Sequence, residues 1–185
     1  ITSIIARIAS GLSQLYAIKF FLNNLNANEY SAIILLLGYL PLFFLFEFCF
    51  SQTIQNKFNQ RAIKATDSIK ILIFHLICLM AVALFISNTD FLPKLLLNES
   101  LLTEEIIRNF SIGSALLVLM SNSIVLKRVL IILKRANLYS VLILIQSILQ
   151  IAGLYFYSLE ANVTQLYSII LYIGPGLVLP LILLM

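Results

Sequence analysis

The sequence predicts an all-α, polytopic membrane protein built as a six-transmembrane-helix bundle. Hydrophobic residues make up 61% of the 185 positions, charged residues make up 11%, and the mean hydropathy is +1.03. A water-soluble fold of this size needs more polar surface than that. Six apolar stretches also come near the length of about 20 residues with which a helix crosses a bilayer. The function classes that require a soluble domain are therefore excluded.

The six predicted spans differ in their charge. Four of them lie in stretches without Asp, Glu, Lys or Arg. The second span carries only Glu47, whereas the first carries Arg7 and Lys19. The approximate boundaries of the predicted spans are 1–22, 31–50, 70–88, 108–127, 138–158 and 165–185.

The cations are concentrated in every second connection, which predicts an orientation. The second and fourth connections together hold eight Lys and Arg residues, and the others hold two. By the positive-inside rule, the two basic connections and both ends of this segment are expected in the cytoplasm, in a multi-pass protein of the cell membrane. The excess of cations, which gives the net charge of +4, is then explained by the orientation of the protein in the lipid bilayer. No nucleic-acid partner is expected.

The charges within the first two spans are candidate functional groups, because a charge at membrane depth costs about 2.5 to 3.5 kcal/mol on insertion scales. Arg7 belongs to a polar stripe that also includes Gln14. Glu47 lies in the next, antiparallel span, at a depth from which it could pair with Arg7. Two interpretations stay open: a neutralising pair that fixes helix packing, or groups that line an aqueous cavity.

Amides in the fourth and fifth spans extend this candidate site. Asn122 lies on a face of the fourth span that also carries serines, and Gln146 and Gln150 are one turn apart in the fifth. Each amide brings two donors and one acceptor that need partners. A hydrated cavity explains two neighbouring glutamines better than interhelical hydrogen bonds do. The candidate substrate-binding residues are Arg7, Gln14, Glu47, Asn122, Gln146 and Gln150.

The last span contains a predicted hinge. Gly174, Pro175 and Gly176 follow one another, and Pro removes an internal hydrogen bond while Gly weakens the rest of the turn. Gly38 and Pro41 predict a similar break in the second span. Broken helices of this kind are tolerated where they line a cavity or must flex.

The residues for catalysis or metal binding are few. His75 is the single histidine, so no Ser/His/Asp set can be assembled, and it is expected to be a hydrogen-bonded packing residue. Cys49 and Cys78 lack metal-ligand spacing. No enzymatic activity, catalytic residue, metal or cofactor is therefore expected.

Two segments resemble the polysaccharide flippases, the O-antigen transporter branch of the multidrug/oligosaccharidyl-lipid/polysaccharide exporter superfamily. Residues 26–31 read Asn-Ala-Asn-Glu-Tyr-Ser, and residues 50–57 read Phe-Ser-Gln-Thr-Ile-Gln-Asn-Lys after an apolar span. They are similar to the Glu-Tyr-Gly element that enters the second helix of the family and to the turn that leaves it. Ser31 stands where the family has Gly.

The resemblance implies that the segment is the amino-terminal lobe of a two-lobe transporter and lacks the carboxy-terminal bundle. It implies a lipid-linked oligosaccharide as cargo, flipped across the membrane by alternating access, with a polysaccharide polymerase and a chain-length protein as candidate partners. Arg7 would then attract the pyrophosphate or acidic sugars, and the four amide residues would bind hydroxyl groups.

Three alternatives stay open. A multidrug or cation exporter of the same superfamily would need an acid such as Glu47 and tolerate loss of Arg7. An oligosaccharide polymerase would be an enzyme with a large outer loop. A structural membrane subunit would seal the polar stripes in helix contacts.

Overall fold

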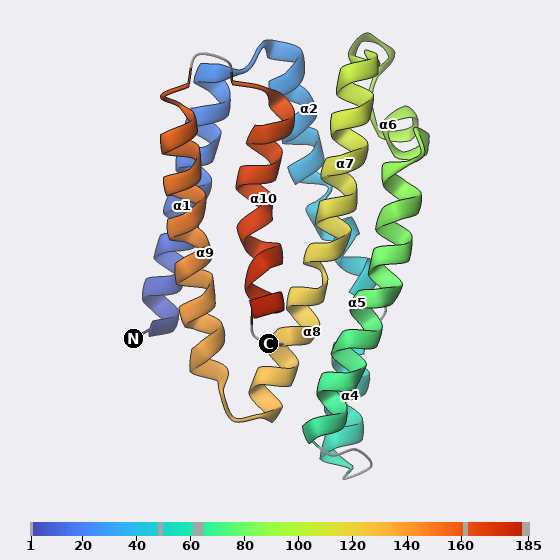
Figure 1. Ribbon diagram of the computed structural model, residues 1–185, viewed down its shortest axis with the longest axis vertical. Coiled ribbons are helices and arrows are strands. Elements are labelled where there is room, and N and C mark those ends of the chain that lie inside the picture. Colours follow the sequence, from blue (N-terminus) through green and yellow to red (C-terminus); the bar gives the residue numbers. More distant parts are fainter. Residues whose placement is uncertain (1, 48–49, 61–64, 161–162, 183–185) are drawn as a thin grey trace.

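The computed structural model describes residues 2–47, 50–60, 65–160 and 163–182, and all regular structure in them is helical. The long helices run roughly alongside one another and form an elongated bundle (Figure 1). The expected all-α class is confirmed. The elements are α1 Thr2–Asn24, α2 Ala27–Gly38, α3 Leu40–Phe43, η1 Phe44–Glu47, α4 Phe50–Asn59, α5 Ala65–Ser87, α6 Phe91–Leu96, η2 Glu99–Leu101, α7 Glu104–Met120, α8 Asn122–Ile132, α9 Ala136–Tyr157 and α10 Gln165–Ile182.

The prediction of six spans is confirmed only in part. Three described segments are long and apolar enough to cross a membrane, namely Ile69–Ser87, Glu104–Ile132 and Asn137–Tyr157. A fourth joins the set if the bent pair Ala27–Gly38 and Leu40–Glu47 is one span. The first predicted span forms a helix of 23 residues, α1, but its two cations and several polar side chains keep it outside this set. The last predicted span lies in α10, where Gln165–Leu177 is an apolar helix, and its end falls outside the residues whose side chains the structure describes.

The break predicted in the second span is confirmed. Helix α2 ends at Gly38, and the two parts of the span meet at an angle of 45°. Pro41 lies in the first turn of α3, where its missing N–H leaves no helical hydrogen bond unmade. The described part of this predicted span, up to Glu47, is therefore two short helices and a 3-10 turn rather than one straight helix.

Helix α2 begins with a capping box formed by residues of the first resemblance segment. The Asn26 side chain accepts the Glu29 N–H at 2.9 Å, and the Glu29 carboxylate accepts the Asn26 N–H at 3.1 Å. Two of the unsatisfied donors at the helix start are thus paired. Glu29 and Asn26 have a local structural role that many helix starts share.

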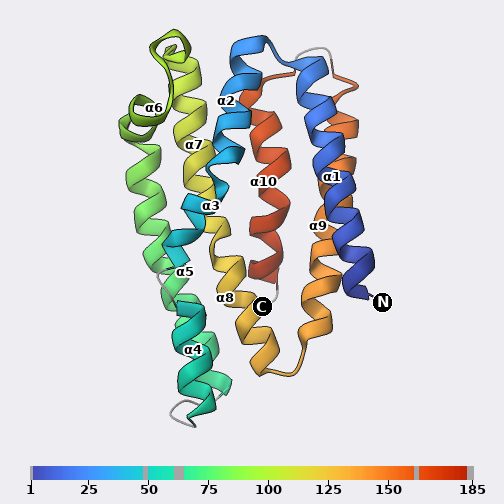
Figure 2. The ribbon, with the colours of Figure 1, turned by 180° about the vertical axis from the view of Figure 1, so that it is seen from behind.

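The helices pack as two groups with α2 and α10 between them. Helix α1 packs along α9, and α5 packs along α7 and α8. Helix α10 contacts both α9 and α7, while α2 contacts α7. Figure 2 shows the same arrangement from behind, with α1 and α9 at one edge and α4 and α5 at the other.

The two ends of the bundle carry opposite charges. The α4–α5 and α8–α9 connections lie at one end, the basic end, whereas the α1–α2 connection, α6 and the α9–α10 connection lie at the other, the acidic end (Figure 1). This is the alternation that the sequence predicts. The described cations at the basic end are Lys57, Lys70, Lys127, Arg128, Lys134 and Arg135, and the described acids at the acidic end are Glu29, Asp90, Glu99, Glu104, Glu105 and Glu160.

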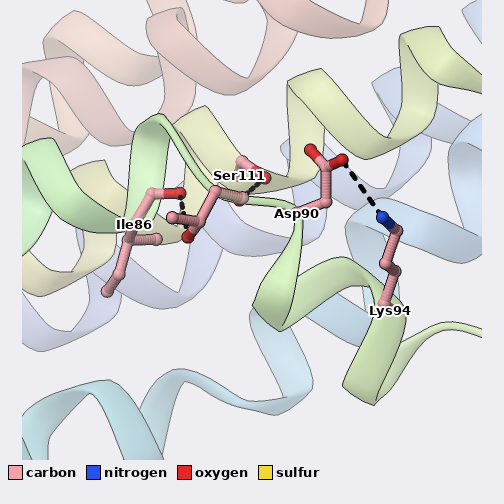
Figure 3. A network of polar contacts seen from close by, with 5 residues as sticks. Ile86, Asp90, Lys94 and Ser111 are labelled. Atoms are coloured by element: carbon pink, nitrogen blue, oxygen red, sulfur yellow. Dashed lines mark hydrogen bonds and ion pairs between the residues drawn. The ribbon is translucent and has the colours of Figure 1, made fainter.

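Polar contacts fasten the connection after α5 to α7 at the acidic end. Ser111 donates to the carbonyl of Thr89 at 3.1 Å, and Thr89 donates to the carbonyl of Ile86 at 3.4 Å. Nearby, Lys94 pairs with Asp90 at 3.3 Å across one turn (Figure 3). The two hydroxyl bonds tie helix α7 to the end of α5, while the exposed ion pair adds little to stability.

Gly113 allows α7 to approach α2 and α10. A Cβ atom there would lie 2.5 Å from Leu36 Cδ2 and 3.3 Å from Ile169 Cγ2. We expect Gly113→Leu to lower the free energy of unfolding by about 1 to 3 kcal/mol, because the added atoms overpack a closed contact. Denaturant unfolding of the detergent-solubilised protein measures this change.

Gly11 provides the matched control, since a Cβ atom there meets nothing within 4 Å. Gly11→Leu should not lower the free energy of unfolding, because Leu favours a helix more than Gly does and its added atoms meet no neighbour. Equal losses in both variants would show that close approach at Gly113 is not the cause.

Candidate functional site

A cavity of about 400 Å³ lies between the two helix groups. Its walls come from α1, α2, α7, α9 and α10, with one residue from α3. Small-molecule sites in proteins span roughly 300 to 1,000 Å³, so this cavity is large enough for a ligand. The lining residues are Ser10, Ser13, Gln14, Ala17, Ile18, Ile34, Leu37, Gly38, Leu40, Leu117, Met120, Gln146, Gln150, Tyr172 and Ile173.

The polar side chains of the cavity wall are neutral. They are hydroxyl and amide groups on α1, α9 and α10, set among aliphatic residues. Among the described lining residues there is no Asp, Glu, Lys or Arg. Three residues of the predicted site, Gln14, Gln146 and Gln150, lie together here. A wall of this chemistry can exchange hydrogen bonds with hydroxyl or amide groups of a ligand, but it offers no counter-ion.

Gln150 also holds three helices together. Its Oε1 accepts from Ser13 Oγ at 3.1 Å, and its Nε2 donates to the carbonyl of Tyr172 at 2.6 Å. The side chain is nearly buried, at 6% exposure. Gln150 thus joins α9 to α1 and α10, and this role in packing accounts for part of the polar face that the sequence singles out.

Gln146 and Gln14 are more available to a ligand. Gln14 is exposed and Gln146 is half-buried. Gln146 packs beside Gly176, where a Cβ atom would lie 3.0 Å from its Nε2. The glycine therefore leaves room for the amide at the wall of the cavity. The role of Gly176 here is to let the Gln146 side chain lie close to the backbone of α10.

The predicted hinge does not end its helix. Helix α10 is assigned from Gln165 to Ile182 and passes through Gly174 and Pro175 without interruption. Pro175 still cannot donate the N–H that would bond the carbonyl of Leu171. A hinge motion at this motif stays a prediction.

Arg7 lies outside the cavity wall. It is exposed, and it precedes Gln14 by seven residues, which is nearly two turns, so both side chains leave the same side of α1. At 1.5 Å per residue the two positions are about 10 Å apart along the helix, with Arg7 toward the basic end. Arg7 can thus receive an anionic group next to the cavity, although it does not line it.

Glu47 is separate from Arg7 and from the cavity. Its Oε1 accepts the N–H of Ser51 at 2.6 Å, in the first turn of α4. A carboxylate there satisfies a free backbone donor and interacts favourably with the helix dipole. No ion pair joins Arg7 to Glu47 within the described residues, because α1 packs on α9 while η1 contacts α7 and α8. The suggested pair is not formed.

Asn122 is also withdrawn from the cavity. It is 2% exposed, and its Oδ1 lies 2.8 Å from Nδ1 of His75 in α5. His75 is fully buried, and its Nε2 lies 3.2 Å from the carbonyl of Phe46. His75 is thus the hydrogen-bonded packing residue that the sequence predicts, with Asn122 as its partner. The two residues join α5, α8 and η1.

The hydrogen bonds of His75 can be made by a neutral ring. The Phe46 carbonyl can only accept, so Nε2 of His75 carries a proton and Nδ1 of a neutral ring accepts. Asn122 Nδ2 has no partner within the described residues. Turning the amide by half a turn brings this NH2 group to Nδ1, which pairs both groups without a buried charge.

Sequence reasoning missed Ser13 and Tyr172 as cavity residues. Ser13 lies one position off the stripe of Arg7 and Gln14, but Ser10, Ser13, Gln14 and Ala17 share the spacing of one helix face. That spacing of small and polar residues was the available signal. Nothing comparable marks Tyr172, since its part in the wall depends on how α10 packs.

Comparison of the chain with models of protein families, with curated proteins and with solved structures finds no match. The fold and the cavity define the class: an all-helical protein with several apolar helices compatible with embedding in a membrane. Beyond that class, the function rests on the chemistry of the cavity and the arrangement of charges.

Proposed function

We propose that this chain forms one lobe, with six membrane crossings, of a transporter that flips a polyprenyl-pyrophosphate-linked oligosaccharide across the cytoplasmic membrane. In this proposal α1, the broken α2–η1 segment, α5, α7–α8, α9 and α10 are the crossings. The basic end faces the cytoplasm, as the positive-inside rule favours. The cargo class comes from the resemblance of residues 26–31 and 50–57 to the polysaccharide flippases.

The observation that carries the proposal is the neutral, hydrogen-bonding cavity between the two helix groups. Sugars present many hydroxyl groups and, at an uncharged unit, no formal charge, so amides such as Gln14 and Gln146 suit them. Arg7, about 10 Å along α1 toward the basic end, suits a pyrophosphate at the reducing end of the same cargo.

The rival exporter of drugs or cations receives less support. It requires an acid at the transport site, and no Asp or Glu is among the described residues that line the cavity. Glu47, the acid that it would use, instead accepts the Ser51 N–H at the start of α4. The cavity chemistry thus favours a polar, uncharged group as the part of the cargo that enters it.

Arg7 gives the direct test. The full-length protein carrying Arg7→Ala is expressed in a strain that lacks its own flippase, and surface polysaccharide is measured with protein level checked by immunoblot. We expect a loss of about tenfold or more, because a charge-assisted contact to phosphate is worth roughly 1.5 to 3 kcal/mol. Arg7→Lys should retain part of the activity.

Lys19→Ala is the matched control, since Lys19 is also an exposed cation of α1 and does not line the cavity. Its surface polysaccharide should equal that of the unmodified protein. Normal polysaccharide with Arg7→Ala would remove Arg7 from the mechanism. Absence of polysaccharide with the unmodified protein would instead reject the cargo class.

A further inference from the structure

A second hollow lies at the basic end, on the side of the bundle away from the cavity. It is an apolar slot of about 360 Å³ between α4 and α5. Residues from both helices line it: Phe50, Thr53, Ile54, Lys57, Lys70, Ile71 and Phe74. We call it the α4–α5 slot.

Two lysines contribute to the slot, one from each helix. Lys57 is exposed, and it has no ion-pair partner in the described part of the chain. The Lys70 side chain is 79% exposed and lies 3.6 Å from Asp67, which is itself 40% exposed. Even with Asp67 included, these three groups have a net charge of +1. The slot therefore attracts an anion.

The rest of the slot suits a hydrocarbon chain. The rings of Phe50 and Phe74 lie 6.4 Å apart between their centroids, and Phe74 is 58% exposed. The apolar span of α5 begins at Ile69, so Lys70 lies at the membrane edge and Phe74 about one turn deeper. The depth of the charges thus matches lipid headgroups, and the depth of the rings matches the start of the acyl chains.

The slot is separate from the cavity between the two helix groups. Helices α7 and α8 pack against α5 on its inner side, and α4 packs on α8, whereas the cavity lies beyond α7. Figures 1 and 2 agree that α4 and α5 form the edge opposite α1 and α9. An occupant of the slot would therefore come from the surrounding lipid of the leaflet at the basic end.

We propose that the α4–α5 slot binds one anionic phospholipid, with the phosphate between Lys57 and Lys70 and an acyl chain along Phe50 and Phe74. Basic pockets between membrane helices on the cytoplasmic side are suited to anionic headgroups, and that leaflet supplies them. The bound lipid would brace α4 against α5. This proposal requires a membrane but does not depend on the cargo.

Native mass spectrometry of the full-length protein tests the slot. The protein is titrated with phosphatidylglycerol or with phosphatidylcholine of the same acyl chains. We expect tighter retention of phosphatidylglycerol, reduced about tenfold or more in the double variant Lys57→Gln with Lys70→Gln, because each cation near the surface contributes about 1 kcal/mol. Thermal unfolding checks that the variant is folded.

The control pair is Lys134→Gln with Arg135→Gln, which removes the same charge from exposed positions at the same end but outside the slot. It should reduce retention less than about twofold. Equal losses in both pairs, or equal retention of the two phospholipids, would overturn the proposal. Displacement of phosphatidylglycerol by an equal concentration of polyprenyl phosphate would assign the slot to the cargo lipid instead.

Discussion

Under the proposed function, replacing Gln14 and Gln146 together by Leu is expected to reduce transport by about tenfold or more, with normal protein level. Leu keeps roughly the volume of Gln but removes its donors and its acceptor, so hydroxyl groups of the cargo would lose their partners in the cavity. The measurement is surface polysaccharide in the strain that lacks its own flippase. Each single variant should show a smaller loss.

Gln52→Leu is the matched control for this double variant. Gln52 is an exposed amide of α4 that does not line the cavity. Its loss should leave polysaccharide unchanged. If the double variant transports as well as the unmodified protein, the cavity is not the path of the sugar, whatever Arg7 does.

Asn122→Leu is expected to lower the free energy of unfolding by about 1 to 2 kcal/mol, because it leaves Nδ1 of buried His75 without a partner. His75→Leu should cost a similar amount. The double variant should cost less than the sum of the two, because the apolar pair leaves fewer unpaired polar groups behind. Denaturant unfolding in detergent measures all three.

The control for the cluster is Asn59→Leu at the exposed end of α4, which should change the free energy by no more than about 0.5 kcal/mol. Strictly additive losses for Asn122 and His75 would show that the contact between them contributes nothing. Full stability of Asn122→Leu together with loss of surface polysaccharide would instead support the predicted substrate-binding role of Asn122.

The fold could be predicted from the sequence wherever the structure of a segment depends on its own residues. The all-helical class and the break after Gly38 were predictable from local composition, and the predicted fourth span, 108–127, lies within α7 and α8. Glu104–Ile132 covers 29 residues, or about 43 Å, more than the roughly 30 Å of hydrocarbon. What local composition overstated is the apolarity of α1.

The candidate site was only partly predictable because it depends on which helices become neighbours. The spacing of Gln146 and Gln150 indicated a polar face. In the structure, the Gln150 side chain is hydrogen-bonded to the Ser13 hydroxyl and to the Tyr172 carbonyl. Asn122 and His75 are 47 positions apart in the sequence, and no pattern along either helix predicts their contact. Gly113 and Gly176 likewise matter because side chains of other helices pack closely against them, which the sequence does not reveal.

The sequence by itself indicated apolar helices compatible with a membrane and an alternation of charge between their connections, since both follow from the polarity of neighbouring residues. Only the tertiary structure decided that Gln14, Gln146 and Gln150 share one cavity, that Glu47 stabilises the start of α4, and that Asn122 pairs with His75. The physical reason is that a side chain finds its hydrogen-bond partners across helix contacts, and those contacts are set by packing over the entire bundle.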